Sequence, residues 1–347
     1  ETLIRYLFEP LFENLWAPLM LRLSWKLGSD GILHDILVGK LTEGGIDFGE
    51  SFGLLTTGLY VPLGAVLPYV FSFFIVLSFL EDSGYLPRLV VLMDSLMHRI
   101  GLHGMSIIPM LLGFGCNVPG ALATRILENK RQRFITATLM SIAIPCMALQ
   151  AMVIALAGEH GALALLIIFG ALFMVWLGLG LILNKILKGE SPELLIDIPP
   201  YRIPYFPGLL KKIWARLFWF LREAVPWVLI GVFLANILYT LGIIDFIGKM
   251  AEPVMKGVFG LPPEAVGALV LGFLRKDVAV GMLKPLRLSF DQVIVASVVL
   301  SMYFPCVATF TVLLKVFGLL DMIKAAAIMV ASALIVGGLL NFALTWI

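Results

Sequence analysis

The stretch LLGFGCNVPG, residues 111–120, places a cysteine, an asparagine and a proline among glycines inside an apolar segment. Glycine and proline weaken or interrupt the helical hydrogen bonds that satisfy backbone groups in lipid. Gly113, Gly115, Pro119 and Gly120 lie close together here, which predicts a broken or re-entrant helix. A simple membrane anchor has no need of such a break, so we interpret it as a working part of the protein.

The chain as a whole has the composition of a polytopic membrane protein. Its 347 residues are 60% hydrophobic and 14% charged, whereas soluble domains are about half apolar and about a quarter charged. The net charge is only +2 and no basic run is interleaved with aromatic residues, which argues against a nucleic-acid partner. The three cysteines all lie in apolar segments, where we expect free thiols rather than disulfides.

Hydrophobic runs predict the membrane spans. A helix needs about 20 apolar residues to cross roughly 30 Å of hydrocarbon. Two apolar segments, 104–124 and 262–284, are interrupted, the second by Arg275, Lys276 and Asp277. Six other runs are free of charge and long enough to span: 51–80, 134–157, 161–183, 224–244, 293–314 and 325–347. The sequence therefore predicts an all-α polytopic fold with six spans and two broken segments.

The chain also repeats itself. Residues 100–114 align with 259–273, and residues 144–158 align with 304–318, at a constant offset of 159 to 160 residues. Chance rarely gives such agreement over two blocks. If each broken segment re-enters on its own side, each half crosses the membrane three times. An odd number of crossings forces the halves into opposite orientations, as inverted repeats require.

The distribution of Lys and Arg predicts the topology. With the loop 125–133 in the cytoplasm, 15 of the 25 basic residues fall in cytoplasmic segments, namely 81–100, 125–133, 184–222 and 315–324. This excess agrees with the positive-inside rule. It places residues 1–52 at the outer surface, where their pattern predicts amphipathic helices. The first residue is Glu1, so we expect a processed terminus or a further segment upstream.

Two cysteines follow a proline in the middle of a span: Cys146 follows Pro145, and Cys306 follows Pro305. Proline frees the carbonyl about one turn earlier, and the adjacent thiol adds a soft ligand. This combination suits a borderline or soft divalent cation better than Na⁺ or Mg²⁺. The alternative is that each cysteine is only a small buried apolar side chain. Since Cys116 also lies at a break, we favour metal handling.

Charged and polar side chains supply weaker candidates. Arg275, Lys276 and Asp277 match the positions of Cys116, Asn117 and Val118 in the first half. Charges at membrane depth usually line a cavity or pair with one another, although a shallow segment would let them reach water. Glu81 and Asp82 end the first span and are secondary metal candidates. No nucleotide-hydrolysing motif and no catalytic triad are present, so we expect a transporter rather than an enzyme.

Four motifs together resemble the membrane domain of the ferrous iron transport protein B (FeoB) family. They are LSFLEDSGYLPR (77–88), GFGCNVPGALATR (113–125), GFLRKDVAV (272–280) and FPCVATF (304–310). The resemblance runs from about residue 53 to the C-terminus. It implies two gate-type repeats, 53–183 and 223–347, separated by the cytoplasmic connection 184–222 and preceded by the N-terminal segment 1–52.

The resemblance also implies the function. Members of the family import Fe²⁺ across the inner membrane, with Fe²⁺ as the transported substrate and no permanently bound cofactor. Cys116, Asn117, Cys146 and Cys306 are the ligands carried over to this chain. The family normally has a GTP-binding domain, so we expect a GTPase in the same or a separate chain, and a homo-oligomer is compatible with this architecture. Leu149 stands where family members often have an arginine.

Two other functions are compatible with the sequence. One is a gate-repeat transporter of another solute such as a nucleoside, for which polar, aromatic and carboxylate side chains would be expected at the breaks. The other is a membrane protein that does not transport and instead docks a separate GTPase through 125–133 or 184–222. The three thiols at the breaks favour the iron transporter over both.

Overall fold

The computed structural model describes residues 67–187, 200–240, 243–274 and 276–346, with six isolated positions before them. Every regular element in these ranges is a helix, which confirms the predicted all-α class. Most of the N-terminal segment 1–52, the first part of the predicted span 51–80, and Arg275 lie outside the described residues.

The first half of the chain contains a series of seven helices among the described residues. Short 3₁₀ turns, η4 (Gly104–Ser106), η5 (Thr124–Ile126) and η6 (Gly158–His160), join some of them. The helices are α5 (Leu67–Asp82), α6 (Tyr85–Arg99), α7 (Ile107–Gly115), α8 (Asn117–Ala123), α9 (Lys130–Ala143), α10 (Met147–Ala157) and α11 (Ala162–Ile186).

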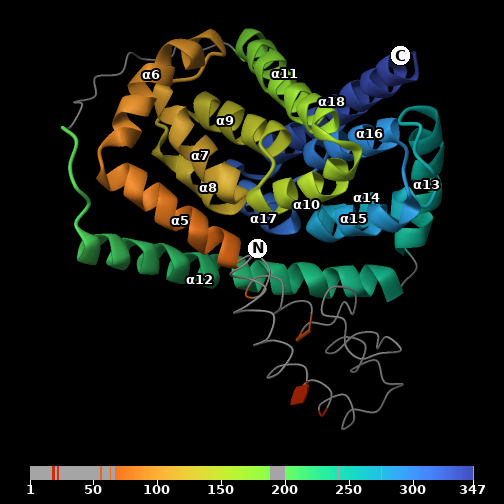
Figure 1. Ribbon diagram of the computed structural model, residues 1–347, viewed down its shortest axis with the longest axis horizontal. Helices are drawn as coiled ribbons and strands as arrows, with labels where there is room; N and C mark the ends of the chain where they lie inside the picture. The colour runs from red at the N-terminus through yellow and green to blue at the C-terminus, as the bar shows by residue number, and fades with distance from the viewer. Residues whose placement is uncertain are drawn as a thin grey trace. The chain divides into compact units, whose positions relative to one another are not determined.

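The second half repeats this order in its described part. Its helices are α12 (Phe206–Thr240), α13 (Ile243–Gly257), α14 (Ala265–Leu274), α15 (Lys276–Leu283), α16 (Phe290–Met302), α17 (Val307–Phe317) and α18 (Leu319–Thr345), with the turn η7 (Lys284–Leu286) after α15. Figure 1 shows the short helices α7, α8, α10, α14, α15 and α17, which all belong to one compact unit.

The chain divides into two compact units. One consists of residues 76–212 and 248–347, and the other of residues 1–75 and 213–247. The first unit contains both broken segments and all three cysteines.

Two equivalent glycines show the duplication in atomic detail. Gly101 has φ 74° and Gly260 has φ 65°, a left-handed conformation that favours glycine. A Cβ at Gly101 would lie 2.0 Å from the side chain of Asn184, and one at Gly260 would lie 2.6 Å from Asn341. Each asparagine amide also donates to the carbonyl two residues before its glycine, at 3.5 and 3.0 Å. The same turn against the same helix is thus built twice.

The two Pro-Cys spans run in opposite directions. The rings of Phe134, near the start of α9, and Phe317, at the end of α17, have centroids 5.5 Å apart. At the other end, the rings of His160 and Phe290 are 6.3 Å apart. The start of each span therefore lies beside the end of the other, which is the arrangement that an inverted repeat requires.

One end of this bundle gathers segments predicted to be cytoplasmic. Arg131 donates from Nε to the carbonyl of Leu187 at 2.5 Å and from Nη1 to that of Gly101 at 3.2 Å. The backbone N–H of Arg202 donates to Ser83 at 3.2 Å. At the opposite end, Lys284 pairs with Glu159 at 3.0 Å. The loops that follow the two broken segments thus lie at opposite ends of the bundle.

Length and apolarity identify four spanning helices in the described part of the chain: Lys130–His160, Ala162–Ile186, Phe290–Phe317 and Leu319–Thr345. A fifth arises if Val70–Asp82 and Tyr85–Arg99, which are bent by 86°, form one broken span. These four correspond to predicted runs in both halves. The predicted spans 51–80 and 224–244 lie partly outside the described residues.

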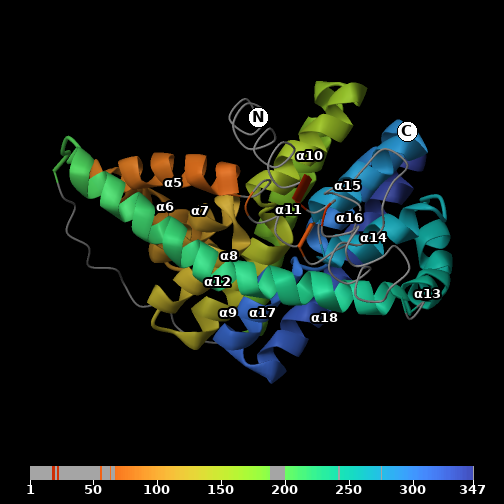
Figure 2. The same cartoon turned by 90° about the horizontal axis from the view of Figure 1, so that it is seen from below.

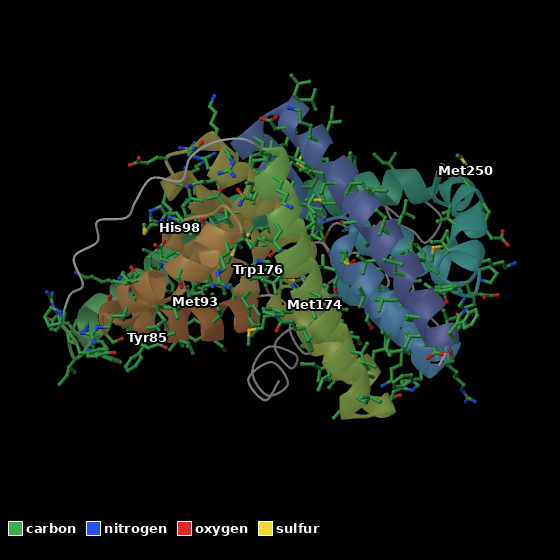
Figure 3. The ribbon with its side chains drawn as sticks, turned by 90° about the horizontal axis from the view of Figure 1, so that it is seen from above. Tyr85, Met93, His98, Met174, Trp176 and Met250 are labelled. Atoms are coloured by element: carbon green, nitrogen blue, oxygen red, sulfur yellow. The ribbon has the colours of Figure 1, made fainter. Side chains whose placement is uncertain are left out.

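The exposed face of α11 is that of a membrane helix. Met174 is 71% exposed, whereas Trp176 on the same helix is 8% exposed, and Figure 3 labels both. Other exposed side chains of α11 are also large and apolar: Leu163, Leu166, Phe173, Leu181 and Ile182. An apolar exposed surface of this extent fits lipid as the surrounding medium.

The connection between the halves is shorter than the sequence predicts. Residues 184–222 were expected to be a polar connection because of their prolines and charges, but α11 continues to Ile186 and α12 begins at Phe206. Four of the five prolines precede this helix and Pro207 lies in its first turn, where proline is compatible with helix geometry. Residues 188–199 lie outside the described part of the chain.

Candidate functional site

The first break lies at Cys116. The helix α7 ends at Gly115, Cys116 is extended with φ −154° and ψ 131°, and α8 begins at Asn117. The two helices pack against each other, as Figure 1 shows. A Cβ on Gly120 would lie 2.7 Å from the backbone nitrogen of Gly113. The glycines therefore allow the two arms of the hairpin to touch, and the break turns Cys116 out of the helical pattern.

The second break has the same construction. The helix α14 ends at Leu274 and α15 begins at Lys276, and the two arms pack side by side (Figure 2). A Cβ on Gly272 would lie 2.6 Å from the hydroxyl oxygen of Tyr303 and 3.1 Å from Cβ of Ala279. Gly272 and Ala279 thus take the places that Gly113 and Gly120 hold in the first hairpin.

Each Pro-Cys motif forms a short extended turn between two helices. Cys146 has φ −67° and ψ 160°, and Cys306 has φ −59° and ψ 155°. A proline nitrogen cannot donate a hydrogen bond, so Pro145 leaves the carbonyl of Ser141 without its helical donor, and Pro305 does the same to Ser301. A backbone carbonyl in the turn before each cysteine thereby loses its helical donor.

Each hairpin packs against a helix of the opposite half. The arm α8 of the first hairpin packs against α17 of the second half, and α15 of the second hairpin packs against α10 of the first. In Figure 1 these pairs lie together at the centre. Each break is thereby brought to the Pro-Cys turn of the opposite half.

The three cysteines lie next to helices that take part in this crossing of the two halves. None of them forms a disulfide, and all three are half-buried. Cys116 directly precedes α8, which packs against α17, and Cys306 directly precedes α17, while Cys146 directly precedes α10, which packs against α15. Among the residues that the structure describes, no three His, Cys, Asp or Glu side chains are grouped closely enough to form a metal cage. The thiols therefore share one region without forming a closed ligand set.

Lys276 is a buried charged residue of the second hairpin. It is 7% exposed, and its ammonium donates to the carbonyl of Ser301 at 2.8 Å, the oxygen that Pro305 frees. It lies 5.8 Å from the ring centroid of Tyr303, whose hydroxyl donates to the carbonyl of Leu269. A buried ammonium needs such partners, so Lys276 belongs to the interior and does not reach water.

Asn117 holds the equivalent position in the first half. It is 8% exposed, and within the described part of the chain its side-chain oxygen Oδ1 has no hydrogen-bond partner. The same is true there of the hydroxyl of Ser141, whose carbonyl is the one freed by Pro145. Buried oxygens without donors are costly unless a ligand or water completes them.

Sequence reasoning missed three side chains at the Pro-Cys turns. Thr309 lies with its hydroxyl 3.2 Å from the Cys306 sulfur. Gln150 donates from Nε2 to the carbonyl of Pro145 at 2.5 Å. The ring of Tyr303 lies within cation–π range of the Lys276 ammonium. Leu149, the repeat mate of Thr309, is buried and apolar, so the first Pro-Cys turn lacks the hydroxyl found in the second. Only the constant repeat offset could have singled out Thr309.

Other predicted site residues are placed elsewhere or outside the described residues. Glu81 and Asp82 pair with Lys212 at 3.0 and 2.7 Å. Burial alone would lower the pKa of Lys212, but its hydrogen bonds to Asp82 and Glu81 outweigh burial and raise it. These two carboxylates therefore serve an ion pair between the ends of α5 and α12. The positions of Arg275 and of the Asp277 side chain lie outside what the structure describes.

Comparisons with known proteins agree with this architecture. Residues 63–160 and 221–320 match the gate family, described as nucleoside recognition. Residues 165–216 match the C terminus of ferrous iron transport protein B. No solved structure matches the chain.

Curated relatives carry the name Fe(2+) transporter FeoB. The protein of Methanocaldococcus jannaschii is 30% identical over 307 residues, covering 76% of this chain and 46% of that protein. The Synechocystis protein is 32% identical over 67% of this chain and 40% of its own length. The Salmonella typhimurium protein is 34% identical over 67% of this chain and 33% of its own length. The chain thus spans less than half the length of these relatives.

The two gate matches together cover more than half of the chain, and one lies in each half. Between them lies the FeoB match, which covers α11 and the start of α12. The chain therefore belongs to the gate family and, within it, to the membrane part of the ferrous iron transport protein B family.

Proposed function

We propose that this chain forms the membrane path of a transporter that takes up ferrous iron across the inner membrane. The observation that carries the proposal is the packing of each broken hairpin against the Pro-Cys helix of the opposite half, α8 on α17 and α15 on α10, with a cysteine next to three of these helices. Thiolates prefer borderline and soft cations to Mg²⁺ or Na⁺. The names of the curated relatives support Fe²⁺ as the cargo.

The ligand set fits a cargo that must leave again. Three thiols that share a region without a closed cage hold an ion less tightly than a structural tetrahedral site does. The buried Asn117 oxygen and the freed carbonyl of Ser141 supply harder ligands in the first half. An ion with few and mixed ligands is bound with modest affinity, which favours transport over storage.

The energy for uptake would come from a GTPase in the same or a separate chain. The FeoB family match supports this partner, and basic residues at the end of the bundle that carries Arg131 would face the cytoplasm, where GTP is available. The chain itself has no phosphate-binding loop motif. Its own role is then permeation and not catalysis.

A nucleoside is the second candidate cargo, because the description of the gate family names nucleoside recognition. Nucleoside binding would call for hydrogen-bonding side chains and aromatic faces around the breaks. The crossing does hold such side chains, namely Asn117, Gln150, Thr309 and Tyr303. The three thiols beside them and the name of the curated relatives support a metal ion as the first candidate.

Uptake into proteoliposomes tests the proposal. Vesicles that contain the protein, with and without an added GTPase partner, are loaded with an internal Fe²⁺ chelator and given radioactive Fe²⁺ under anaerobic conditions. We expect uptake above that of empty vesicles, and competition by other thiol-binding divalent ions but not by Mg²⁺ or by nucleosides. Uptake of a labelled nucleoside with no uptake of iron would reverse the assignment.

A further inference from the structure

The two halves of the crossing are chemically different although their backbones are equivalent. The first half has a neutral amide, Asn117, at the position that Lys276 holds in the second half, and its buried Oδ1 has no hydrogen-bond partner among the described residues. The second half places the ammonium of Lys276 on the carbonyl freed by Pro305, at 2.8 Å from the oxygen of Ser301. The same position thus carries an unpartnered neutral amide in one half and a side-chain cation bound to a freed carbonyl in the other.

We propose that Lys276 is a tethered cation that covers the second half of the ion path and sets how tightly the path holds a divalent ion. This inference rests on the proposed function. It identifies Lys276 as a positioning and specificity-determining residue and not as a ligand of the metal.

Three observations support this role. The ammonium of Lys276 is 7% exposed, so its charge is retained inside by its partners and not by water. Its helix α15 packs against α10, which begins directly after Cys146, and the carbonyl that it binds belongs to the turn before Cys306. It also lies within cation–π range of Tyr303. The ammonium therefore stands where an ion bound by these thiols would feel its charge.

The physical consequence is repulsion that weakens binding. A divalent cation near a fixed ammonium in a medium of low dielectric is repelled far more strongly than in water. The same ammonium competes for the Ser301 carbonyl, which is one of the few oxygens available there. An ion can use the second half of the path only when Lys276 moves aside, so Lys276 keeps binding weak and release fast.

Binding of Co²⁺ to the purified protein tests the inference separately from iron uptake. Co²⁺ bound to thiolate gives charge-transfer absorption, which reports affinity whether or not the protein transports. Lys276→Met removes the charge and keeps an unbranched chain. Lys276→Gln removes the charge but keeps a donor for the Ser301 carbonyl. It therefore still tests the inference if Lys276→Met does not fold. Lys276→Arg keeps the charge.

We expect Lys276→Met and Lys276→Gln to bind Co²⁺ at least about tenfold more tightly than the unmodified protein, and Lys276→Arg to bind as the unmodified protein does. The matched control is Lys284→Met, because Lys284 follows the same helix but is 61% exposed and pairs with Glu159. This control should leave the affinity unchanged.

Transport by the same variants supplies the second readout. Lys276→Gln should lower both the KM and the maximal rate of iron uptake, because a tightly held ion leaves slowly. An unchanged or lower Co²⁺ affinity in folded Lys276→Gln overturns the inference even if the unmodified protein transports iron. If the unmodified protein fails to transport but Lys276→Gln binds Co²⁺ more tightly, the proposed function fails and the role of Lys276 stands.

Discussion

Phe134 and Phe317 lie with their ring centroids 5.5 Å apart, although one is at the start of the first Pro-Cys span and the other is at the end of the second. His160 and Phe290 make the reciprocal contact at the opposite end. This pair of contacts makes the two spans antiparallel. It also places each hairpin against the Pro-Cys turn of the other half, because α8 packs on α17 and α15 on α10.

The orientation of this bundle in the membrane is the first prediction. Residues 125–133 and Leu187 lie at one end, and Glu159 and Lys284 lie at the other. We expect a cysteine introduced at Lys130 to react with an impermeant maleimide only from the cytoplasmic side, and one introduced at Lys284 only from outside. These labelling experiments use a background in which the three native cysteines are serine.

The opposite labelling pattern would reverse the topology but keep the repeats inverted. Labelling of both positions from the same side would contradict the inverted arrangement itself.

Local rules predicted the breaks, and tertiary packing decided what the breaks contact. Gly113, Pro119 and Pro145 interrupt helices through backbone geometry that can be read from the sequence. The cross-packing of α8 with α17 depends on contacts between residues almost 200 positions apart and has no local signal. The hydrogen bond from Lys276 to the carbonyl of Ser301 likewise joins two helices, and no local sequence pattern predicts that these helices pack together.

Glu81 and Asp82 illustrate the same limit. Carboxylates at the end of a span are compatible with a metal site, with solvent, or with an ion pair, and the sequence alone leaves all three open. Their partner Lys212 lies 130 residues away at the start of another helix. The role of these carboxylates depends on which helix ends lie together in the folded protein, and the sequence alone does not give this.

The second prediction concerns close packing inside the first hairpin. A Cβ at Gly120 would lie 2.7 and 2.8 Å from backbone atoms of Gly113 and 2.6 Å from the Met140 sulfur. Backbone cannot move aside as a side chain end can, so we expect Gly120→Ala to destabilise the protein by about 1–3 kcal/mol. A lower melting midpoint in detergent measures the loss.

The matched control for this prediction is Gly170→Ala on α11. No atom lies within 4 Å of a Cβ at Gly170, and alanine is the better helix former. We expect its melting midpoint to equal or exceed that of the unmodified protein. A stable Gly120→Ala variant would show that the two arms of the hairpin do not touch at this position.

The third prediction concerns Arg131, which ties together three segments at one end of the bundle. Its guanidinium donates to the carbonyls of Gly101 and Leu187 and, at 2.5 Å, to the side chain of Asn184. Arg131→Met leaves these acceptors without a charged donor, and we expect a loss of about 2 kcal/mol in stability. The measurement is again the melting midpoint.

Lys130→Met is the control for Arg131, because Lys130 is its neighbour and is exposed. Substitutions at such surface positions usually change stability by about 0.5 kcal/mol or less. Equal midpoints for the two variants would mean that the hydrogen bonds of Arg131 contribute nothing to holding this end together.

The fourth prediction tests the thiols themselves. Serine keeps the size of cysteine but is a much poorer ligand for a borderline cation. Cys116 lies at the break of the first hairpin, in an extended conformation between α7 and α8, so we expect Cys116→Ser to cause the largest loss. Removing groups that only orient metal ligands costs about 10- to 100-fold, and we expect Cys116→Ser and Cys306→Ser to lower iron uptake by at least about tenfold.

Cys146→Ser should have a smaller effect, because Gln150 still satisfies the carbonyl of Pro145 beside it. Folding must be unchanged for these losses to be informative, and equal melting midpoints of the three variants and the unmodified protein would establish this. The Co²⁺ charge-transfer absorption should weaken in parallel with uptake, since both report sulfur ligation. Iron uptake at the unmodified rate in all three variants would mean that the cysteines only pack the crossing, and the ion path would then have to be sought among its oxygens.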